Sequence, residues 1–471
     1  MKIYRIIFYL AVLLTILFLA SCAQSLNKLQ QIKNSGELKV LIQNIPGIYY
    51  EGPFGPVGFD YDLAKLFAEH LGVKLVLINK PNVSQMLKSL KTHQADMATG
   101  RIIKTEQRIK QFHFSTSYHH LNQQLIYRSG QKYPKKLQQL DQYSIEVIKD
   151  SSQEELLFNL KNTLLPKLDW HSNEDSSVEG LLDLVNEKVI DFTIANSDEV
   201  KINQRFYPEL RIALSLAQDQ PISWAFTYLD NDSSLVDEAN KFLDNYKRTH
   251  QLTILTERYY GHIDQFDYVD TRVFQRHIKT RLPKFQEWFK KAGQDQRLDW
   301  NLLAAISYQE SHWKNDATSP TGVKGLMMLT HATAEYIGVN NRLSPYQSIF
   351  GGAEYFSKLL KRLPDEVKEP DKTYFALASY NMGYGHLSDA RKLCKLRGLD
   401  NTKWANLKQV LPLLQRTKWH KQTRYGYARG YQAVHYVKNI RRYYDILKWQ
   451  DEEKKKKPEK IKALDIIVPA L

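Results

Sequence analysis

One acidic residue, Glu310, stands where a carboxyl group could act as an acid catalyst. Asp299 is a plausible N-cap for a helix predicted over residues 300–311, on which Leu302, Ile306 and Glu310 recur four residues apart and share one apolar face. Burial disfavours the charged form of a carboxyl group, and so do the carbonyl dipoles at a helix C-terminus. A raised pKa is what a general acid needs near neutral pH. The alternative is an exposed helix glutamate at the end of the stripe.

Other side chains that could do chemistry give weaker signals. The chain has only two cysteines, Cys22 and Cys394, which excludes a disulfide framework and any multi-cysteine zinc site. His119 and His120 are adjacent and lack the spacing of metal ligands. We therefore expect no metal and no cofactor.

Composition and charge limit the number of domains and the kinds of partner that the chain can have. A length of 471 residues with 43% apolar residues predicts two or three folded domains. The net charge of +15 is concentrated in residues 267–450, which carry 31 Lys and Arg against 16 Asp and Glu, whereas residues 22–266 carry 27 against 30. The segment from Arg391 to Gln450 alone carries 15 Lys and Arg against 2 Asp and Glu. Such a run indicates an anionic partner or, more simply, a solvated face.

The N-terminus predicts export. Lys2 and Arg5 precede an uncharged apolar run over residues 6–20, which is typical of a signal peptide and short for a membrane span. The run ends in Leu19-Ala20-Ser21-Cys22, which resembles a bacterial lipobox. That resemblance implies cleavage after residue 21 and a lipid on Cys22, with a plain signal peptide or a short anchor as alternatives. Export makes nucleic acid an unsuitable partner, and the residue after Cys22 fits the sorting pattern for the outer membrane.

Residues 33–266 read as an α/β domain. Apolar runs predict strands over residues 38–42, 73–78 and 95–99, with helices over 60–71 and 84–90 between them. This order implies a parallel sheet with a crevice at the carboxyl ends of its strands. A second set follows, with strands over residues 144–148 and 191–195 and a helix over 180–185. The segment 222–229 then returns, with helices behind it up to Gly261.

This half resembles the periplasmic solute-binding proteins of the polar amino-acid type. The resemblance rests on Gly58 to Ala64, Asp96 to Ser115 and Leu252 to Gly261. It implies two lobes that close on an amino acid or a peptide. Arg108 falls where that family places the arginine for a ligand carboxylate, which suits a planar guanidinium. Asn196 falls where the family often has an acidic residue for the ligand ammonium, and Asp198 is nearby but out of step.

The second half resembles a lytic transglycosylase domain of the goose-type lysozyme-like fold. The matching blocks are Glu310-Ser311-His312, Ala317 to Gly322, Gly325 to Leu329, Ala378 to Gly383, and Tyr436-Val437 with Ile440. Together with the lipobox and the solute-binding half, they match the membrane-bound lytic murein transglycosylase F family. The resemblance implies a multidomain chain: a two-lobed α/β periplasmic-binding-protein-like domain followed by a mainly α-helical, lysozyme-like domain.

The family implies the reaction and the site residues. Its members cleave the β-1,4 bond between N-acetylmuramic acid and N-acetylglucosamine in peptidoglycan and leave a 1,6-anhydromuramic end. Glu310 is then the single catalytic acid, with assistance from the substrate itself, because Asp316, Glu335 and Glu354 read more simply as surface or capping residues. The implied substrate-binding residues are Ser319, Met328, Tyr380, Asn381 and Tyr436, where Met328 replaces the glutamine of many relatives.

The predicted organisation has five segments. They are a signal peptide (1–21), a linker with lipidated Cys22 (22–32), a solute-binding and regulatory domain (33–266), a transglycosylase domain (267–450) and a charged tail (451–471). Fusion of the two domains suggests that a ligand of the first regulates the second. The alternative function is a non-catalytic lipoprotein that binds glycan and solute, and the environment of Glu310 separates the two.

Overall fold

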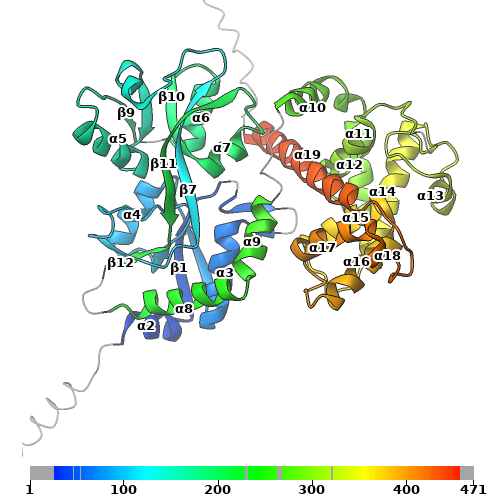
Figure 1. The fold of residues 1–471 in the computed structure, drawn as a ribbon, viewed down its shortest axis with the longest axis horizontal. Helices are drawn as coiled ribbons and strands as arrows, with labels where there is room; N and C mark the ends of the chain where they lie inside the picture. The colour runs from blue at the N-terminus through cyan, green and yellow to red at the C-terminus, as the bar shows by residue number, and fades with distance from the viewer. Residues whose placement is uncertain are drawn as a thin grey trace, which may run out of the picture.

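The chain folds into an α/β part and an all-helical part, which Figure 1 shows side by side. The computed structural model describes residues 26–456 apart from 46, 53–54, 175, 229–231, 262–267 and 320–321. The predicted signal peptide and Cys22 lie outside the described residues. Two separate five-stranded sheets build the α/β part, and they define its first and second lobes.

The first lobe contains the sheet β4-β1-β5-β12-β6. The strands are β1 (Glu37–Ile42), β4 (Lys74–Asn79), β5 (Met97–Ala98), β6 (Phe112–Phe114) and β12 (Ala225–Thr227). Strand β1 pairs in parallel with β4 and β5, as predicted, but β12 pairs antiparallel with β5 and β6. The three strands predicted over residues 38–99 are thus parallel, and the antiparallel strand β12 lies beside them because it enters directly from the other lobe without a crossover helix.

Helices α3 (Phe59–Leu71) and α4 (Val83–Lys91) link the parallel strands of the first lobe. Helix α2 (Lys28–Ser35) and helices α8 (Ser234–Arg248) and α9 (Gln251–Tyr260) complete this lobe together with the hairpin of β2 (Tyr50–Gly52) and β3 (Gly55–Val57). The buried face of α3 places Leu63, Phe67 and Leu71 in the lobe's apolar core. The helix predicted over residues 60–71 is therefore present.

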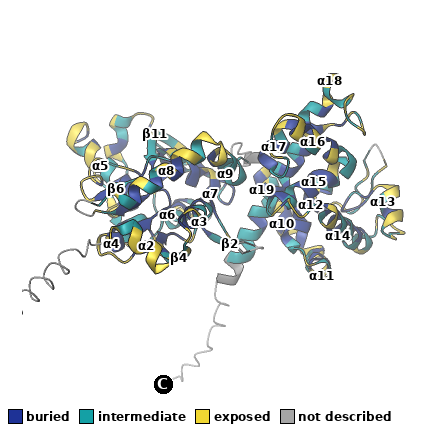
Figure 2. Cartoon of the chain, turned by 90° about the horizontal axis from the view of Figure 1, so that it is seen from below, coloured by how far each residue is buried: buried dark blue, intermediate teal, exposed yellow. Residues whose placement is uncertain are grey.

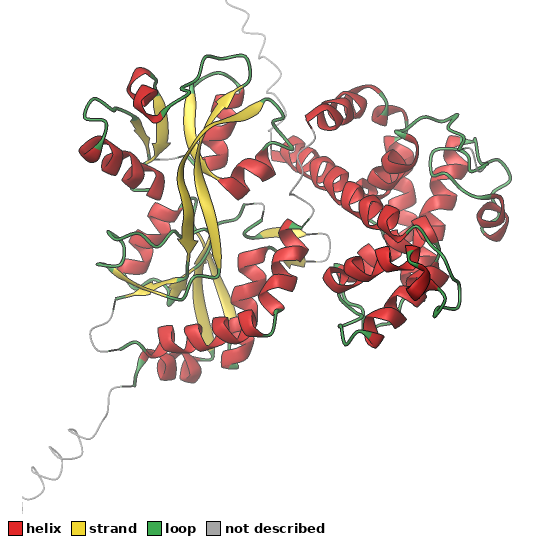
Figure 3. Cartoon of the chain, in the orientation of Figure 1, coloured by secondary structure: helices red, strands yellow, loops and turns green. Residues whose placement is uncertain are grey.

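The second lobe contains the sheet β11-β7-β10-β8-β9. Its elements are β7 (His119–Arg128), β8 (Ile145–Ile148), α5 (Ser152–Thr163), β9 (His171–Asn173), α6 (Val178–Asn186), β10 (Phe192–Asn196), α7 (Ser197–Asn203) and β11 (Leu210–Ile222). The predicted strands and helix of this lobe are all present. The long antiparallel pair β7–β11 was not predicted, and it runs from one lobe to the other (Figure 3).

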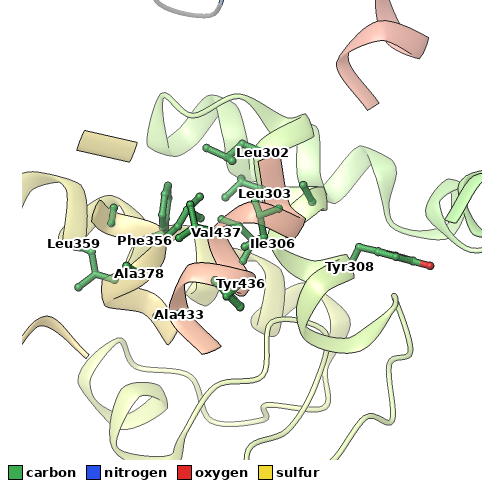
Figure 4. Close-up of a cluster of buried hydrophobic side chains, with 14 of the residues drawn as sticks. Leu302, Leu303, Ile306, Tyr308, Phe356, Leu359, Ala378, Ala433, Tyr436 and Val437 are labelled. Atoms are coloured by element: carbon green, nitrogen blue, oxygen red, sulfur yellow. The ribbon is translucent and has the colours of Figure 1, made fainter. Parts of the chain in front are cut away.

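The helical part surrounds one central helix, α12 (Trp300–Ser311), which has the bounds that the sequence predicted. Every residue of α12 from Asn301 to Tyr308 is buried, so the helix is enclosed on all sides and has no exposed polar face. Figure 4 shows its Leu302, Leu303 and Ile306 in one apolar cluster with side chains of later helices, among them Phe356, Ala378 and Val437. The end of α12 is therefore held firmly in place.

The other helices form a shell around α12. They are α10 (Tyr268–Thr280), α11 (Gln286–Gln296), α13 (His331–Tyr336), α14 (Pro345–Arg362), α15 (Asp371–Met382), α16 (Tyr384–Leu396), α17 (Trp404–Val410), α18 (Thr417–His420) and α19 (Gly430–Lys456). Helix α19 continues six residues beyond position 450, where the sequence was expected to become a tail. Within the described ranges, no helix combines the length and the apolar character that crossing a membrane requires.

The two parts meet along α19 and α15. Arg205 of the second lobe pairs with Asp445 at 2.5 Å, and Arg258 of α9 pairs with Asp371 at 3.0 Å. Phe206 stacks on Trp449, with ring centroids 4.6 Å apart. Figure 2 shows buried residues in both parts and along α19 between them. Helix α19 thus belongs to the helical core and also to the contact with the α/β part.

Asp299 fastens α12 to α19. As the N-cap of α12 its carboxylate accepts a hydrogen bond from the backbone N–H of Asn301 at 2.9 Å. Its other oxygen accepts from the Tyr444 hydroxyl at 2.9 Å and lies 3.4 Å from the Lys448 ammonium. The Asp299 side chain therefore accepts hydrogen bonds both from the N-terminus of α12 and from the Tyr444 hydroxyl of α19.

We predict that Asp299→Ala lowers the stability of the helical part by about 1–3 kcal/mol, because a cap is lost and Tyr444 loses its acceptor. The thermal unfolding midpoint of the full chain measures this effect. Asp295→Ala, which removes an exposed carboxylate on α11, is the matched control and should leave the midpoint unchanged. Equal midpoints for both variants would contradict the role given to Asp299.

Candidate active site

The carboxyl group of Glu310 sits half-buried in the last turn of α12. The helix ends at Ser311, and its C-cap His312 has a left-handed backbone conformation (φ 51°) that turns the chain away two residues after Glu310. The Tyr436 hydroxyl, from α19, donates a hydrogen bond to Glu310 Oε1 at 2.5 Å. The predicted acid and one of its predicted partners are therefore brought together from positions 126 residues apart.

Burial raises the pKa of Glu310 to about 7, and the hydrogen bond from Tyr436 opposes part of that rise. This upward shift of the pKa agrees with the expectation from the sequence that burial disfavours the charged form of Glu310. Burial also raises the pKa of Tyr436 and of Tyr380 well above the ordinary value, and the charge of Glu310 adds to both rises. Both phenols therefore stay protonated and can donate hydrogen bonds near neutral pH.

A short loop after α12 is fixed beneath the site. The hydroxyls of Ser307 and Ser311 donate to the Leu326 carbonyl at 3.0 Å and 2.9 Å. The Tyr380 hydroxyl donates to the Met327 carbonyl at 2.8 Å. Gly325 has a φ of +85°, and a Cβ there would lie 1.9 Å from the Arg342 carbonyl oxygen, so only glycine fits. Sequence reasoning missed Ser307, although its four-residue spacing from Ser311 was available as a signal.

The remaining predicted substrate-binding residues are Met328 on this loop, Ser319 before it and Asn381 on α15. Met328 is half-exposed on the loop itself, with a φ of +48°. The Ser319 hydroxyl accepts a hydrogen bond from the backbone N–H of Val323 at 3.2 Å and so closes a turn. Asn381 is exposed at the end of α15. Their roles toward a substrate stay predictions.

The three acidic residues weighed as a second carboxylate have surface environments. Glu354 pairs with Lys358 one helical turn away at 2.9 Å, and Glu335 lies 4.0 Å from His331 with 79% of its side chain exposed. Asp316 is exposed as well. His119 stacks on Tyr260 in the α/β part. In the described parts of the chain, no group of three or more His, Cys, Asp or Glu side chains is arranged to hold a metal ion.

In the α/β part, the predicted ligand residues are engaged with the protein itself. Arg108 lies 2.7 Å from the Glu155 carboxylate, and its guanidinium also donates to the Ile103 carbonyl at 3.3 Å. Asn196 is the N-cap of α7, and its backbone N–H donates to Glu199 at 2.7 Å. Asp198 is 2.5 Å from Arg101, a residue that sequence reasoning missed. An arginine directly after Gly100, in an otherwise apolar segment, was the available signal.

The comparisons with known proteins agree with this architecture. A family model described as bacterial extracellular solute-binding proteins, family 3, matches residues 38–262, and one described as transglycosylase SLT domain matches residues 287–400. A solved structure of an ancestral arginine-binding protein bound to arginine is 22% identical, with a TM-score of 0.42 over 48% of this chain and 99% of that one.

Two curated relatives span almost the whole chain. Membrane-bound lytic murein transglycosylase F of Hahella chejuensis is 44% identical over 437 residues, covering 92% of this chain and 85% of the relative. The protein of the same name from Pseudomonas fluorescens strain Pf-5 is 43% identical over 434 residues, covering 92% and 89%.

The fold, the matched domains and the two relatives define a class of enzyme, a lytic transglycosylase that carries a solute-binding-protein-like domain. At more than 40% identity over nine-tenths of its length, the chain belongs to the membrane-bound lytic murein transglycosylase F family. The predicted fold class, a two-lobed α/β domain followed by a mainly helical lysozyme-like domain, is confirmed.

The raised pKa of Glu310 has a consequence for stability. Its folded-state pKa of about 7 exceeds the ordinary value of 4.5, so ionising Glu310 as the pH rises through this window costs folding free energy. We predict that Glu310→Gln stabilises the chain relative to wild type at pH 8 by up to about 3 kcal/mol, less where water reaches the carboxyl group, and that this gain vanishes near pH 4. Thermal midpoints of both proteins at the two pH values measure the difference, and a gain that is independent of pH would refute the assignment.

Proposed function

We propose that the chain cleaves the β-1,4 bond between N-acetylmuramic acid and N-acetylglucosamine of peptidoglycan and leaves a 1,6-anhydromuramic end, with Glu310 as the only catalytic carboxyl group. The observation that carries this proposal is the half-buried Glu310, with a pKa of about 7 and a hydrogen bond from Tyr436. A carboxyl group that is still partly protonated at neutral pH can give its proton to a leaving oxygen.

The reaction needs Glu310 twice. Protonated Glu310 gives its proton to the glycosidic oxygen as the bond to C1 breaks, and the acetamido group of the muramic residue shelters the positive charge at C1. Ionised Glu310 then accepts the proton of the sugar's own 6-hydroxyl as that oxygen attacks C1. An attack within one molecule has a high effective molarity, and it yields the anhydro ring without water.

Tyr436 favours the ionised state that forms during the first step. A hydrogen bond from a phenol to a carboxylate is stronger than one to a neutral carboxyl group, so the contact gains strength as the proton leaves Glu310. Ser319, Met328, Tyr380 and Asn381 are proposed to contact the sugars. The basic run from Arg391 onward suits the carboxylates of the peptides that peptidoglycan carries, because it raises the local concentration of an anionic polymer.

The α/β domain is proposed to bind an amino acid, a peptide or a muropeptide, with Arg108 and Asn196 in the ligand crevice, and to regulate turnover. A lipid on Cys22 is proposed to hold the enzyme at the outer membrane, facing the periplasm. The names of the relatives describe membrane-bound enzymes, which supports membrane association.

Product analysis tests the catalytic proposal. Full-length protein is incubated with purified peptidoglycan, and soluble products are identified by mass spectrometry. We expect anhydromuropeptides from wild type and a loss of at least ~100-fold in Glu310→Gln, which keeps the shape of the side chain but cannot donate the proton. Glu354→Gln, on the surface of α14, is the matched control and should retain full activity. Equal release by the wild type and Glu310→Gln would remove Glu310 from the mechanism, and hydrolysed reducing ends from wild type would overturn the anhydro product.

Membrane fractionation tests the anchor. Wild-type protein expressed in a Gram-negative host should pellet with the outer membrane, and Cys22→Ala should lose the lipid, because thioether formation needs the sulfur. Incorporation of radiolabelled palmitate gives the direct readout. Label in the Cys22→Ala protein, or none in the wild type, would contradict a lipid on Cys22.

A further inference from the structure

The two lobes of the α/β domain face each other across the place where such folds bind ligands. Segment 99–111 follows β5 in the first lobe, and helices α5 and α7 follow β8 and β10 in the second. Strand β1 is parallel to β5, and β8 is parallel to β10. The carboxyl ends of parallel strands are the usual site of a ligand crevice.

Arg101 crosses this crevice from the first lobe. Its Nε lies 2.5 Å from Asp198 at the start of α7, and its Nη1 lies 3.7 Å from Glu199 and 3.9 Å from Glu179 of α6. The Arg101 side chain is 4% exposed and that of Asp198 is 8% exposed. Gly47 makes room for the guanidinium, because a Cβ there would lie 3.1 Å from Arg101 Nη2.

Arg108 makes a second crossing. Its Nε lies 2.7 Å from Glu155 of α5, with the two side chains 4% and 15% exposed, and its Nη2 lies 3.5 Å from the carbonyl oxygen of Asp150. A third inter-lobe pair, Lys88 with Asp150 at 2.9 Å, is more than half exposed on both sides. Exposed pairs contribute little, whereas a buried charge needs a partner whenever it is kept from water.

We propose that the pairs Arg101–Asp198 and Arg108–Glu155 form an inter-lobe latch that closes the crevice in the absence of a ligand. The guanidinium of Arg101 then occupies the space of a ligand cation, and the carboxylate of Glu155 occupies the space of a ligand carboxylate. The chain fills its own site with the two charges of a free amino acid. This inference rests on the proposal that the crevice is the ligand site.

The latch sets a condition on any ligand. When the lobes part, water solvates all four charges, and closure on a ligand desolvates them again. A ligand held between the lobes must therefore offer an anionic group to the arginines and a cationic group to the acids. A neutral sugar or an apolar molecule cannot meet that condition, and a small amino acid competes with side chains that are already in place.

The experiment measures the distance between the lobes without a ligand. In the full chain carrying Cys22→Ala, spin labels are attached at Lys91→Cys on α4 and Asn162→Cys on α5, both exposed and on opposite sides of the crevice. Double electron–electron resonance should give one narrow, short distance. The variant Asp198→Asn with Glu155→Gln should lengthen that distance by more than ~2 Å, because buried Arg108 loses its carboxylate and buried Arg101 keeps only its longer contacts with Glu199 and Glu179.

Two further variants keep the test decisive. Arg101→Gln with Arg108→Gln removes the same pairs from the first lobe and should open the crevice too. Asp150→Asn breaks only the exposed Lys88 pair and should leave the distance unchanged; asparagine tolerates the left-handed backbone found there (φ 55°). A broad or long distance in the wild type overturns the latch, and so does an unchanged distance in both double variants. Because no peptidoglycan is cleaved in this measurement, its failure is distinct from a failure of the catalytic proposal.

Discussion

The hydrogen bond between Tyr436 and Glu310 is the interaction on which the proposed catalytic site depends. A carboxyl group withdrawn from water tends to stay protonated, and one that accepts a hydrogen bond tends to ionise. Burial exceeds the effect of Tyr436, and the resulting pKa of about 7 places Glu310 between the two states near neutral pH. A substantially weaker hydrogen bond would raise the pKa further and make Glu310 a weaker acid, and a more exposed carboxyl group would have lost its proton at neutral pH.

This balance requires that two helices keep a fixed relation to each other. Helix α12 is buried on all sides, and Asp299 ties its first turn to α19 while Tyr436 of α19 meets its last turn. The opposite face of α19 meets the α/β domain, where Asp445 pairs with Arg205 and the guanidinium of Arg441 donates to the carbonyl of Arg258. One helix therefore contacts both Glu310, the proposed catalytic acid, and the α/β domain. That shared helix gives the proposed regulation a continuous physical route.

The sequence predicted those features whose cause is local. Helix α12 and its cap followed from Asp299 and the spacing of Leu302 and Ile306, and the short strands of both lobes followed from their apolar runs. The pair β7–β11 was missed because polar residues such as Gln123, Gln124 and Gln220 interrupt its pattern and because its register shifts along its length. The acidic partners of Arg101 and Arg108 could not be predicted either. Each ion pair joins residues from different lobes, and nothing in the local sequence indicates which acid lies opposite.

The positive charge of residues 267–450 could affect the pKa of Glu310. A cluster of Lys and Arg near a carboxyl group would lower its pKa and remove the proton that catalysis needs. The pKa of Glu310 is instead set by burial and by Tyr436, with no contribution from a lysine or an arginine among the described residues. Tyr436 lies within the basic run from Arg391 to Gln450 and is buried, whereas Lys418, Lys421 and Arg424 of the same run are exposed. The proposed attraction of an anionic polymer by these exposed cations is therefore compatible with a raised pKa at Glu310, the proposed catalytic acid.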